Sequence, residues 1–121
     1  MGTLGYGLPD ALETEVALTT PDAVSVQRQL YVLKTRSVQY VCLEASSIGL
    51  EQGRLKEVRV HAALYTNLSR DHLDYHSSME SYAQAKERLA KFKGLKAAIV
   101  NADDAHAVRF GQLAFECGRG L

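Results

Sequence analysis

The sequence predicts an α/β fold built on a mainly parallel sheet. Short apolar runs typical of buried strands occur at 38–43, 58–65 and 97–100, and segments with helical spacing of apolar residues separate or flank them. The chain has 121 residues, of which 46% are hydrophobic and 23% charged, so it can form one globular domain with a real core. Ligands of such sheets bind beyond the carboxyl ends of the strands, where polar stretches are therefore of most interest.

The first half of the chain begins with a loop-rich stretch, 3–18, which includes a short strand over 15–18. A helix is predicted to begin at Thr20, whose hydroxyl suits an N-cap, and to end near Lys34. After the strand at 38–43, the segment 46–56 is polar and interrupted by glycine, which predicts a loop with a helical turn.

The second half follows the strand at 58–65 with a polar stretch at 66–78. An amphipathic helix is predicted over 79–92, and its apolar face consists of Tyr82, Ala85, Leu89 and Phe92. The strand at 97–100 then leads into a helix over 103–117, whose acidic start suits the helix dipole.

The composition excludes several classes of protein. Fourteen basic and 14 acidic residues give a net charge of zero, which argues against a nucleic-acid or anionic-membrane partner. No apolar run approaches the roughly 18 residues of a membrane span, and no signal peptide is recognisable. Cys42 and Cys117 are the only cysteines, which is typical of a reduced, cytoplasmic protein without disulfides.

Four polar features carry the candidate chemistry. Glu44, at the end of a predicted strand, suits a Mg²⁺ ligand, although it also suits a solvated acid or a local hydrogen-bond acceptor. The segment 66–76 concentrates titratable groups that are costly to bury unless they bind something, and its alternative is an exposed charged loop. By residue type alone, Lys86 is an ordinary exposed lysine, and 101–104 is a helix cap.

The run Thr66-Asn-Leu-Ser-Arg-Asp-His-Leu-Asp-Tyr-His76 resembles a signature of the Mur ligase family. It is most similar to the branch that adds the third amino acid of the peptidoglycan precursor. Further matches follow in the expected order across the chain: Thr19-Thr20-Pro21, Glu44-Ala-Ser46-Ser47, Gln52-Gly-Arg54, Tyr82 to Lys86, and Asn101-Ala-Asp-Asp104. The resemblance implies that residues 1–121 are part of the family's central ATPase domain.

The resemblance implies an ATP-dependent ligase that uses Mg²⁺. Such an enzyme phosphorylates the D-glutamate carboxylate of UDP-N-acetylmuramoyl-L-alanyl-D-glutamate, and the amine of meso-diaminopimelate or L-lysine then attacks the acyl phosphate. The reaction belongs to peptidoglycan synthesis, and through it to cell shape and division. Phosphoryl transfer depends on positioning and charge neutralisation, which fits a site rich in metal ligands.

The resemblance also implies roles for individual residues. Glu44, His72 and Lys86 match metal ligands, and His72 and Lys86 match catalytic positions. Lys86 would act as a carbamate formed with CO₂, because an ammonium group cannot ligate Mg²⁺, and its place beside Ala85 predicts a position at the edge of the apolar helix face. Asn67 matches a nucleotide contact. Residues that match contacts to the UDP-muramoyl-dipeptide are Thr19, Thr20, Ser46, Gln52 and Arg54.

Two positions depart from the family pattern: Leu18 stands where many relatives have Asn, and Ile48 replaces a common His. The family's phosphate-binding loop is missing, because no Gly-x-x-x-x-Gly-Lys-[Ser/Thr] occurs in these residues. The chain is therefore expected to be an incomplete P-loop-type domain that is inactive alone. Separately, the full-length parent protein is expected to be a monomer. The alternatives are a non-catalytic module that binds a nucleotide sugar or a metal, and another ligase of the superfamily such as a cyanophycin synthetase.

Overall fold

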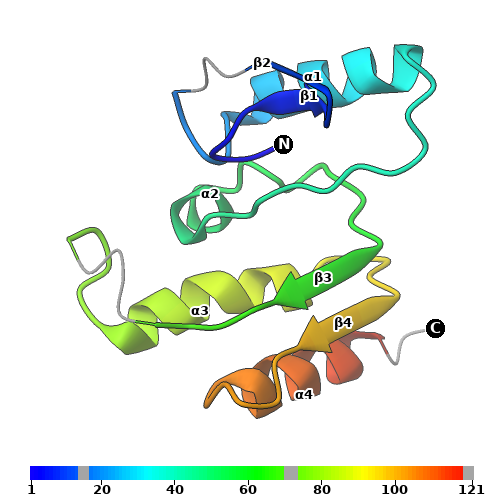
Figure 1. Cartoon of the computed structure of the whole chain (residues 1–121). Helices are drawn as coiled ribbons and strands as arrows, with labels where there is room; N and C mark the ends of the chain where they lie inside the picture. The colour runs from blue at the N-terminus through cyan, green and yellow to red at the C-terminus, as the bar shows by residue number, and fades with distance from the viewer. Residues whose placement is uncertain (14–16, 70–73, 119–121) are drawn as a thin grey trace. The chain divides into compact units, whose positions relative to one another are not determined.

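The computed structural model describes residues 1–13, 17–69 and 74–118. The chain forms two compact units, Met1–Val58 and Arg59–Leu121. Figure 1 shows β1, β2, α1 and α2 in the first unit and β3, α3, β4 and α4 in the second. The predicted α/β class is confirmed, but among the described residues only the sheet of the second unit is parallel.

The first unit begins with a β-hairpin that the sequence analysis assigned to a loop. Strands β1 (Tyr6–Leu8) and β2 (Ala11–Glu13) pair antiparallel. Gly7 allows this pairing, because its φ is +132° and a Cβ there would lie 2.6 Å from the carbonyl oxygen of Ala11. The strand predicted over 15–18 falls partly on residues outside the described ranges, and its described residues, 17 and 18, are not in a strand.

Helix α1 spans Ala23–Thr35. With Thr20 as its N-cap it would have begun at residue 21, so it begins two residues later than predicted. Its N-cap is Asp22, whose Oδ1 accepts hydrogen bonds from the backbone N–H groups of Val24 and Ser25, both at 3.0 Å. The Ser25 hydroxyl donates to the other oxygen at 2.6 Å and holds the pKa of Asp22 below its usual value. The prediction of Thr20 as the cap was wrong, because the Thr20 hydroxyl is engaged elsewhere in the unit.

The strand predicted over 38–43 is not formed. Strand-type pairing of this segment within the described chain is limited to Met1, whose amine donates to the Cys42 carbonyl and whose carbonyl accepts from Glu44 N–H, both at 2.9 Å. One such pair does not make a ladder, although the run is apolar enough for a strand. The predicted helical turn is present as α2 (Ser47–Glu51), capped by Ser46.

The second unit contains a parallel pair of strands, β3 (Ala62–Tyr65) and β4 (Ala97–Val100), in the register Ala62 to Ala97. β4 has the predicted bounds, whereas β3 begins four residues after the predicted start at 58. The strands end together, because pairing continues only as far as Tyr65 and Val100. Their carboxyl ends therefore lie at the same edge of the sheet.

Helices α3 (Met79–Ala90) and α4 (Ala107–Gly118) complete this unit; α4 packs against β4, and α3 packs against α4. Ser78 caps α3 in a capping box with Ser81. The predicted apolar face of α3 is confirmed for Tyr82, Ala85 and Leu89, which are buried, but not for its fourth predicted member. Phe92 lies beyond the end of α3 and is half-buried. α4 begins later than predicted, since 101–106 form turns.

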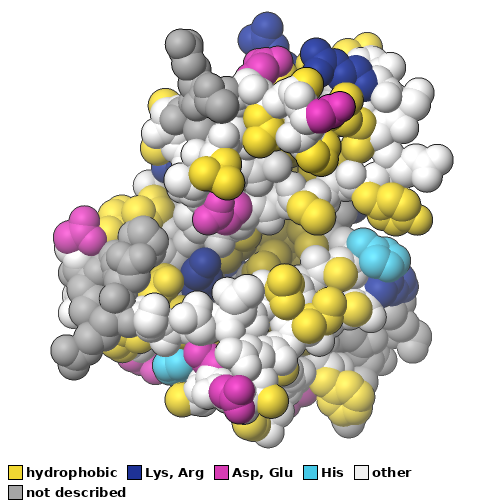
Figure 2. Space-filling view, viewed as in Figure 1, with side chains coloured by type: hydrophobic (Ala, Val, Ile, Leu, Met, Phe, Trp, Pro, Cys, Tyr) yellow, Lys and Arg dark blue, Asp and Glu magenta, His cyan; other side chains and the backbone are white. Residues whose placement is uncertain are grey.

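The core of the second unit joins strand and helix through aromatic rings. The Tyr65 and Phe110 rings stack with their centroids 4.4 Å apart, and burial raises the pKa of the Tyr65 hydroxyl. The sheet also carries outward-facing apolar side chains, because Leu64 and Ile99 are 63% and 55% exposed. Figure 2 shows hydrophobic side chains over β3 and β4 on the face it draws. Among the described residues, no helix is long and apolar enough to cross a bilayer.

Candidate functional site

The carboxylate of Glu44 is held in place by its neighbours in the first unit. Its Oε2 accepts hydrogen bonds from the backbone N–H of Thr3 at 2.9 Å and from the Thr3 hydroxyl at 3.0 Å. Because Thr3 donates its only hydroxyl proton to Glu44, the Thr19 hydroxyl, 3.0 Å away, donates to Thr3. Gly2 makes room, since a Cβ there would lie 2.6 Å from Glu44 Oε2. The exposed Glu44 is therefore oriented before any ligand binds.

Thr20 is fully buried and ties two parts of the first unit together. Its hydroxyl donates to the carbonyl oxygen of Glu44 at 2.8 Å and accepts from the backbone N–H of Ser46 at 2.9 Å. Gly49 lies directly against it, because a Cβ at Gly49 would meet the Thr20 side chain at 2.8 Å. Thr20 thus fixes the turn that connects Glu44 to α2, and its hydroxyl is already engaged.

Arg54 is oriented by two residues of the same unit. Its Nη1 donates to the Thr20 carbonyl at 2.6 Å, and its Nε and Nη2 donate to Gln52 Oε1 at 3.0 and 2.6 Å. A guanidinium has five N–H donors, so two are not used by the described residues and could bind an anion. The half-buried position of Arg54 and these three bonds restrict where such an anion would bind.

The first unit therefore brings together every residue that the sequence analysis expected to contact the UDP-substrate. Hydrogen bonds join these five residues to Thr3 and to the predicted metal ligand Glu44. We call the whole set the polar cluster; its members are Thr3, Thr19, Thr20, Glu44, Ser46, Gln52 and Arg54. Ser46 also caps α2 through its hydroxyl, which accepts from Gly49 N–H at 3.1 Å. The sequence analysis missed Thr3, because no local pattern links it to a carboxylate 41 residues away.

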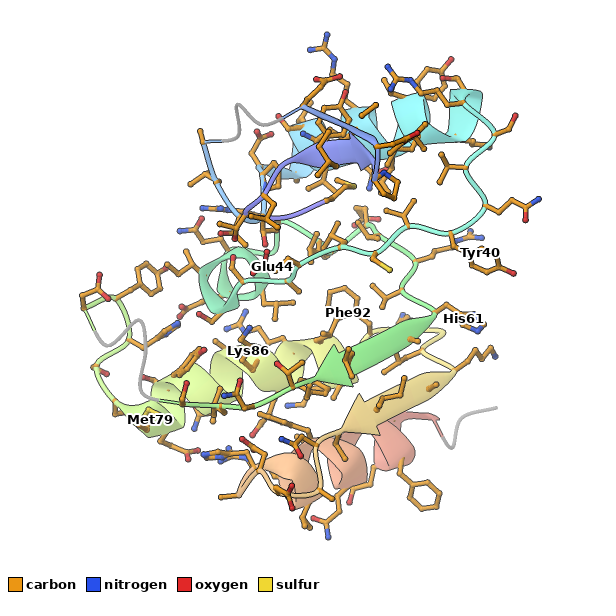
Figure 3. The ribbon with its side chains drawn as sticks, in the orientation of Figure 1. Tyr40, Glu44, His61, Met79, Lys86 and Phe92 are labelled. Atoms are coloured by element: carbon orange, nitrogen blue, oxygen red, sulfur yellow. The ribbon has the colours of Figure 1, made fainter. Side chains whose placement is uncertain are left out.

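Lys86 lies on α3 in the second unit and is half-buried between buried Ala85 and buried Glu87. This agrees with the predicted position at the edge of the apolar face. Figure 3 labels Lys86 on its helix. The carbonyl oxygen of Lys86 accepts a hydrogen bond from the Tyr65 hydroxyl at 3.4 Å, which connects this turn of α3 to β3.

Asn67 is exposed and follows β3 directly after Thr66. The next residue, Leu68, donates its backbone N–H to Asp104 Oδ2 at 2.7 Å, and His106 donates its N–H to Asp104 Oδ1 at 2.8 Å. These bonds, the one from Leu68 above all, hold the pKa of Asp104 below its usual value. The prediction of a helix cap at 101–104 was wrong, because α4 begins only at Ala107; Asp104 instead joins the turn before α4 to the loop after β3.

His72 lies outside the described residues, as do its neighbours at 70, 71 and 73. Within the described ranges, no three His, Cys, Asp or Glu side chains group closely enough to hold a metal ion. Glu44 and Lys86 belong to different units, so the expected set of metal ligands stays a prediction. Leu18 is 47% exposed, Ile48 is half-buried, and both cysteines are free.

Comparison with known proteins identifies relatives that match most of this chain. A family model described as the Mur ligase middle domain matches residues 1–116. A UDP-N-acetylmuramoyl-L-alanyl-D-glutamate–2,6-diaminopimelate ligase of Acidovorax sp. (strain JS42) is 49% identical over 104 residues, which are 86% of this chain and 21% of the relative. The ligase of the same name from Ectopseudomonas mendocina (strain ymp) is 46% identical over 116 residues, 96% of this chain and 24% of the relative.

A solved structure of a ligase with this name is also similar. It superposes with a TM-score of 0.83 at 44% identity and covers 99% of this chain. The match takes up 23% of that longer chain, so the sequence described above spans between a fifth and a quarter of the length of these relatives.

Proposed function

This chain belongs to the family of Mur ligase middle domains, and from that premise we propose that it is part of a MurE-type ligase. The ligase adds meso-diaminopimelate to UDP-N-acetylmuramoyl-L-alanyl-D-glutamate in the cytoplasm, at the expense of ATP. Support comes from relatives at 43–50% identity, which carry the name of the diaminopimelate ligase. The same similarity disfavours a cyanophycin synthetase.

The polar cluster is the observation that carries the proposal. It combines an oriented carboxylate, Glu44, with an oriented guanidinium, Arg54, which has two N–H donors that no described residue uses. A guanidinium fork suits the carboxylate or phosphate oxygens of the UDP-muramoyl-dipeptide. Because these side chains are bonded to one another, they keep their places without the substrate, which reduces the entropy lost on binding.

The donor atoms of Glu44 fit Mg²⁺. Both are carboxylate oxygens, and Oε1 accepts no hydrogen bond from the described residues, while Oε2 is held by Thr3. With Glu44, His72 and Lys86 as ligands, bound Mg²⁺ would supply charge neutralisation for phosphoryl transfer. Lys86 would contribute oxygens after its neutral amine adds to the carbon of CO₂ and releases a proton. Asn67 would contact the nucleotide.

In the proposed reaction, the D-glutamate carboxylate attacks the γ-phosphoryl group of ATP, and ADP leaves. The amine of diaminopimelate then attacks the acyl carbon, a proton is lost, and phosphate leaves as the amide forms. Arg54 and the rest of the polar cluster hold the dipeptide so that its carboxylate meets the phosphoryl group in line. Positioning of this kind supplies a large part of the barrier reduction in such reactions.

The test uses the complete ligase that carries this chain, with ATP, Mg²⁺ and UDP-muramoyl-dipeptide. With diaminopimelate we expect phosphate release and a UDP-muramoyl-tripeptide product that mass spectrometry detects. With L-lysine we expect far less phosphate and far less product. Substrate binding without turnover would instead support a non-catalytic binding module. Polymerisation of amino acids without the UDP-substrate would support a cyanophycin synthetase. The 121-residue chain by itself is expected to show no turnover.

A further inference from the structure

We propose that Asp104 is a positioning residue for nucleotide binding, because it ties the loop that carries Asn67 to the turn after β4. This inference rests on the proposed function, in which Asn67 contacts ATP. It assigns to Asp104 a role other than the helix cap that the sequence analysis predicted.

The tie lies where the two parallel strands end. Tyr65 and Val100 are the last paired residues of β3 and β4, and the backbone N–H of Asn101 donates to the Tyr65 carbonyl at 3.1 Å. The two loops therefore leave the sheet side by side. In parallel sheets this edge is where ligands bind, so the relative position of the two loops decides the shape of the site.

Asp104 uses one carboxylate oxygen to bind the other loop and the second to bind within its own turn. Oδ2 accepts from Leu68 in the loop after β3 at 2.7 Å, and Oδ1 accepts from His106 in the turn before α4 at 2.8 Å. The backbone N–H of Asp104 donates to the Asn101 carbonyl at 3.1 Å, which fixes the turn that holds the carboxylate. Bonds from N–H groups to an ionised carboxylate are about twice as strong as neutral ones.

The bond to Leu68 is not part of the turn before α4. Within that turn Oδ1 accepts from the His106 N–H, whereas Oδ2 accepts from a residue 36 positions away in the sequence. Leu68 is itself buried, so its backbone and side chain both anchor the loop. Asn67 immediately precedes this anchor and is exposed, so it presents its amide from a backbone whose position Asp104 sets.

Asp103 provides a matched control. It is the same residue type in the same turn, it is exposed, and its carboxylate makes no hydrogen bond with the described residues; only its backbone N–H is bonded, to Asn101 Oδ1 at 3.0 Å. Asp103→Asn therefore removes the same charge from the same turn without breaking the tie.

The experiment compares Asp104→Asn, Asp104→Ala and Asp103→Asn in the complete ligase. We would measure the Kd for a non-hydrolysable ATP analogue with Mg²⁺, the KM values for ATP and the UDP-substrate, and amide hydrogen exchange at Leu68. Both Asp104 variants should raise the Kd and the KM for ATP about tenfold. Leu68 exchange should become faster, and the KM for UDP-muramoyl-dipeptide should stay within twofold, while Asp103→Asn matches the wild type.

Several results would overturn the proposal. One is fast exchange at Leu68 in the wild-type ligase, which is measurable even if no Asp104 variant folds. Another is faster exchange in the variants with unchanged affinity for the ATP analogue, since the tie would then not position the nucleotide site. Equal losses for both substrates would indicate a general loss of structure. Because analogue binding needs no turnover, an inactive wild-type ligase that still binds ATP through this loop would count against the proposed function alone.

Discussion

The two units hold their candidate residues by different means. In the first unit, the expected substrate contacts sit in loops and are fixed by hydrogen bonds to one another, with the fully buried Thr20 at the centre. In the second unit, Lys86 projects from a regular helix, and Asn67 follows a strand. There the surrounding framework of stacked rings, ion pairs and the Asp104 carboxylate holds the positions.

This difference predicts how each unit responds to substitution. In the polar cluster, binding and stability depend on the same hydrogen bonds, so changes should affect both. In the second unit, replacing a functional side chain should lower activity with little effect on stability. Weakening the surrounding framework should lower stability while the functional side chain itself remains. The predictions below test this separation.

The largest effect is expected at Lys86. In the complete ligase, Lys86→Ala and Lys86→Arg should lower kcat by at least about a hundredfold, since neither side chain can form a carbamate ligand. Urea unfolding should change little, because Lys86 is only half-buried. Added acetate should partly restore Lys86→Ala by offering carboxylate oxygens.

Lys91→Arg is the control for that experiment, because Lys91 lies just past the same helix, is mostly exposed and keeps its contact with Glu87 as an arginine. It should retain wild-type activity. Wild-type rates for Lys86→Arg would reject the carbamate and leave Lys86 as an ordinary surface lysine.

Thr20→Val tests the coupled behaviour of the first unit. The change is nearly isosteric, but it leaves the Glu44 carbonyl and the Ser46 N–H without their partner in a buried place. We expect a loss of about 1–3 kcal/mol in the free energy of unfolding together with a higher KM for the UDP-substrate. Thr19→Val should have a smaller effect on stability, since Thr19 is only partly buried. A Thr20→Val ligase with an altered KM and unchanged stability would contradict the coupling.

Arg109→Met tests the framework of the second unit. Arg109 on α4 pairs with Glu80 at 2.7 Å and with Glu87, whose side chain is 9% exposed. Without Arg109, the nearly buried Glu87 carboxylate would keep a single ion-pair partner among the described residues, Lys91 at 4.0 Å. Because Arg109 is itself 36% exposed and solvent screens its charge, we expect a loss of stability that is smaller than the loss for a fully buried ion pair. The double variant Arg109→Met/Glu87→Gln should recover part of the lost stability, because it removes the unpaired carboxylate. Urea unfolding of both variants measures this difference.

The smallest effect concerns acid stability. Hydrogen bonds from Arg109 lower the pKa of Glu80 from 4.5 to about 2. A carboxyl group with a lowered folded-state pKa contributes stability above its unfolded pKa, and this contribution disappears as the pH falls through the folded value. Glu80→Gln should therefore reduce the dependence of the urea midpoint on pH between about 4.5 and 2. An unchanged dependence would show that solvent screens this exposed pair completely.

The sequence by itself was sufficient where local patterns decide. The 3.6-residue spacing of Tyr82, Ala85 and Leu89 placed α3 and its buried face, and the short apolar run of β4 gave its bounds. The motifs also identified the family, because residue types and their order do not depend on the fold. Even the partial burial of Lys86 followed from its position on the helix.

Only the tertiary structure decided which polar groups pair. Asp22 rather than Thr20 caps α1, because the Thr20 hydroxyl binds groups 24 and 26 residues away. The hydrogen bonds from Thr3 to Glu44 and from Leu68 to Asp104 join residues that are still farther apart, 41 and 36 positions in the sequence. The apolar run at 38–43 is not a strand for the same reason: a strand requires a partner, which no local pattern specifies. Propensity acts within a few residues, whereas each of these hydrogen bonds forms only after distant segments have been brought together by folding.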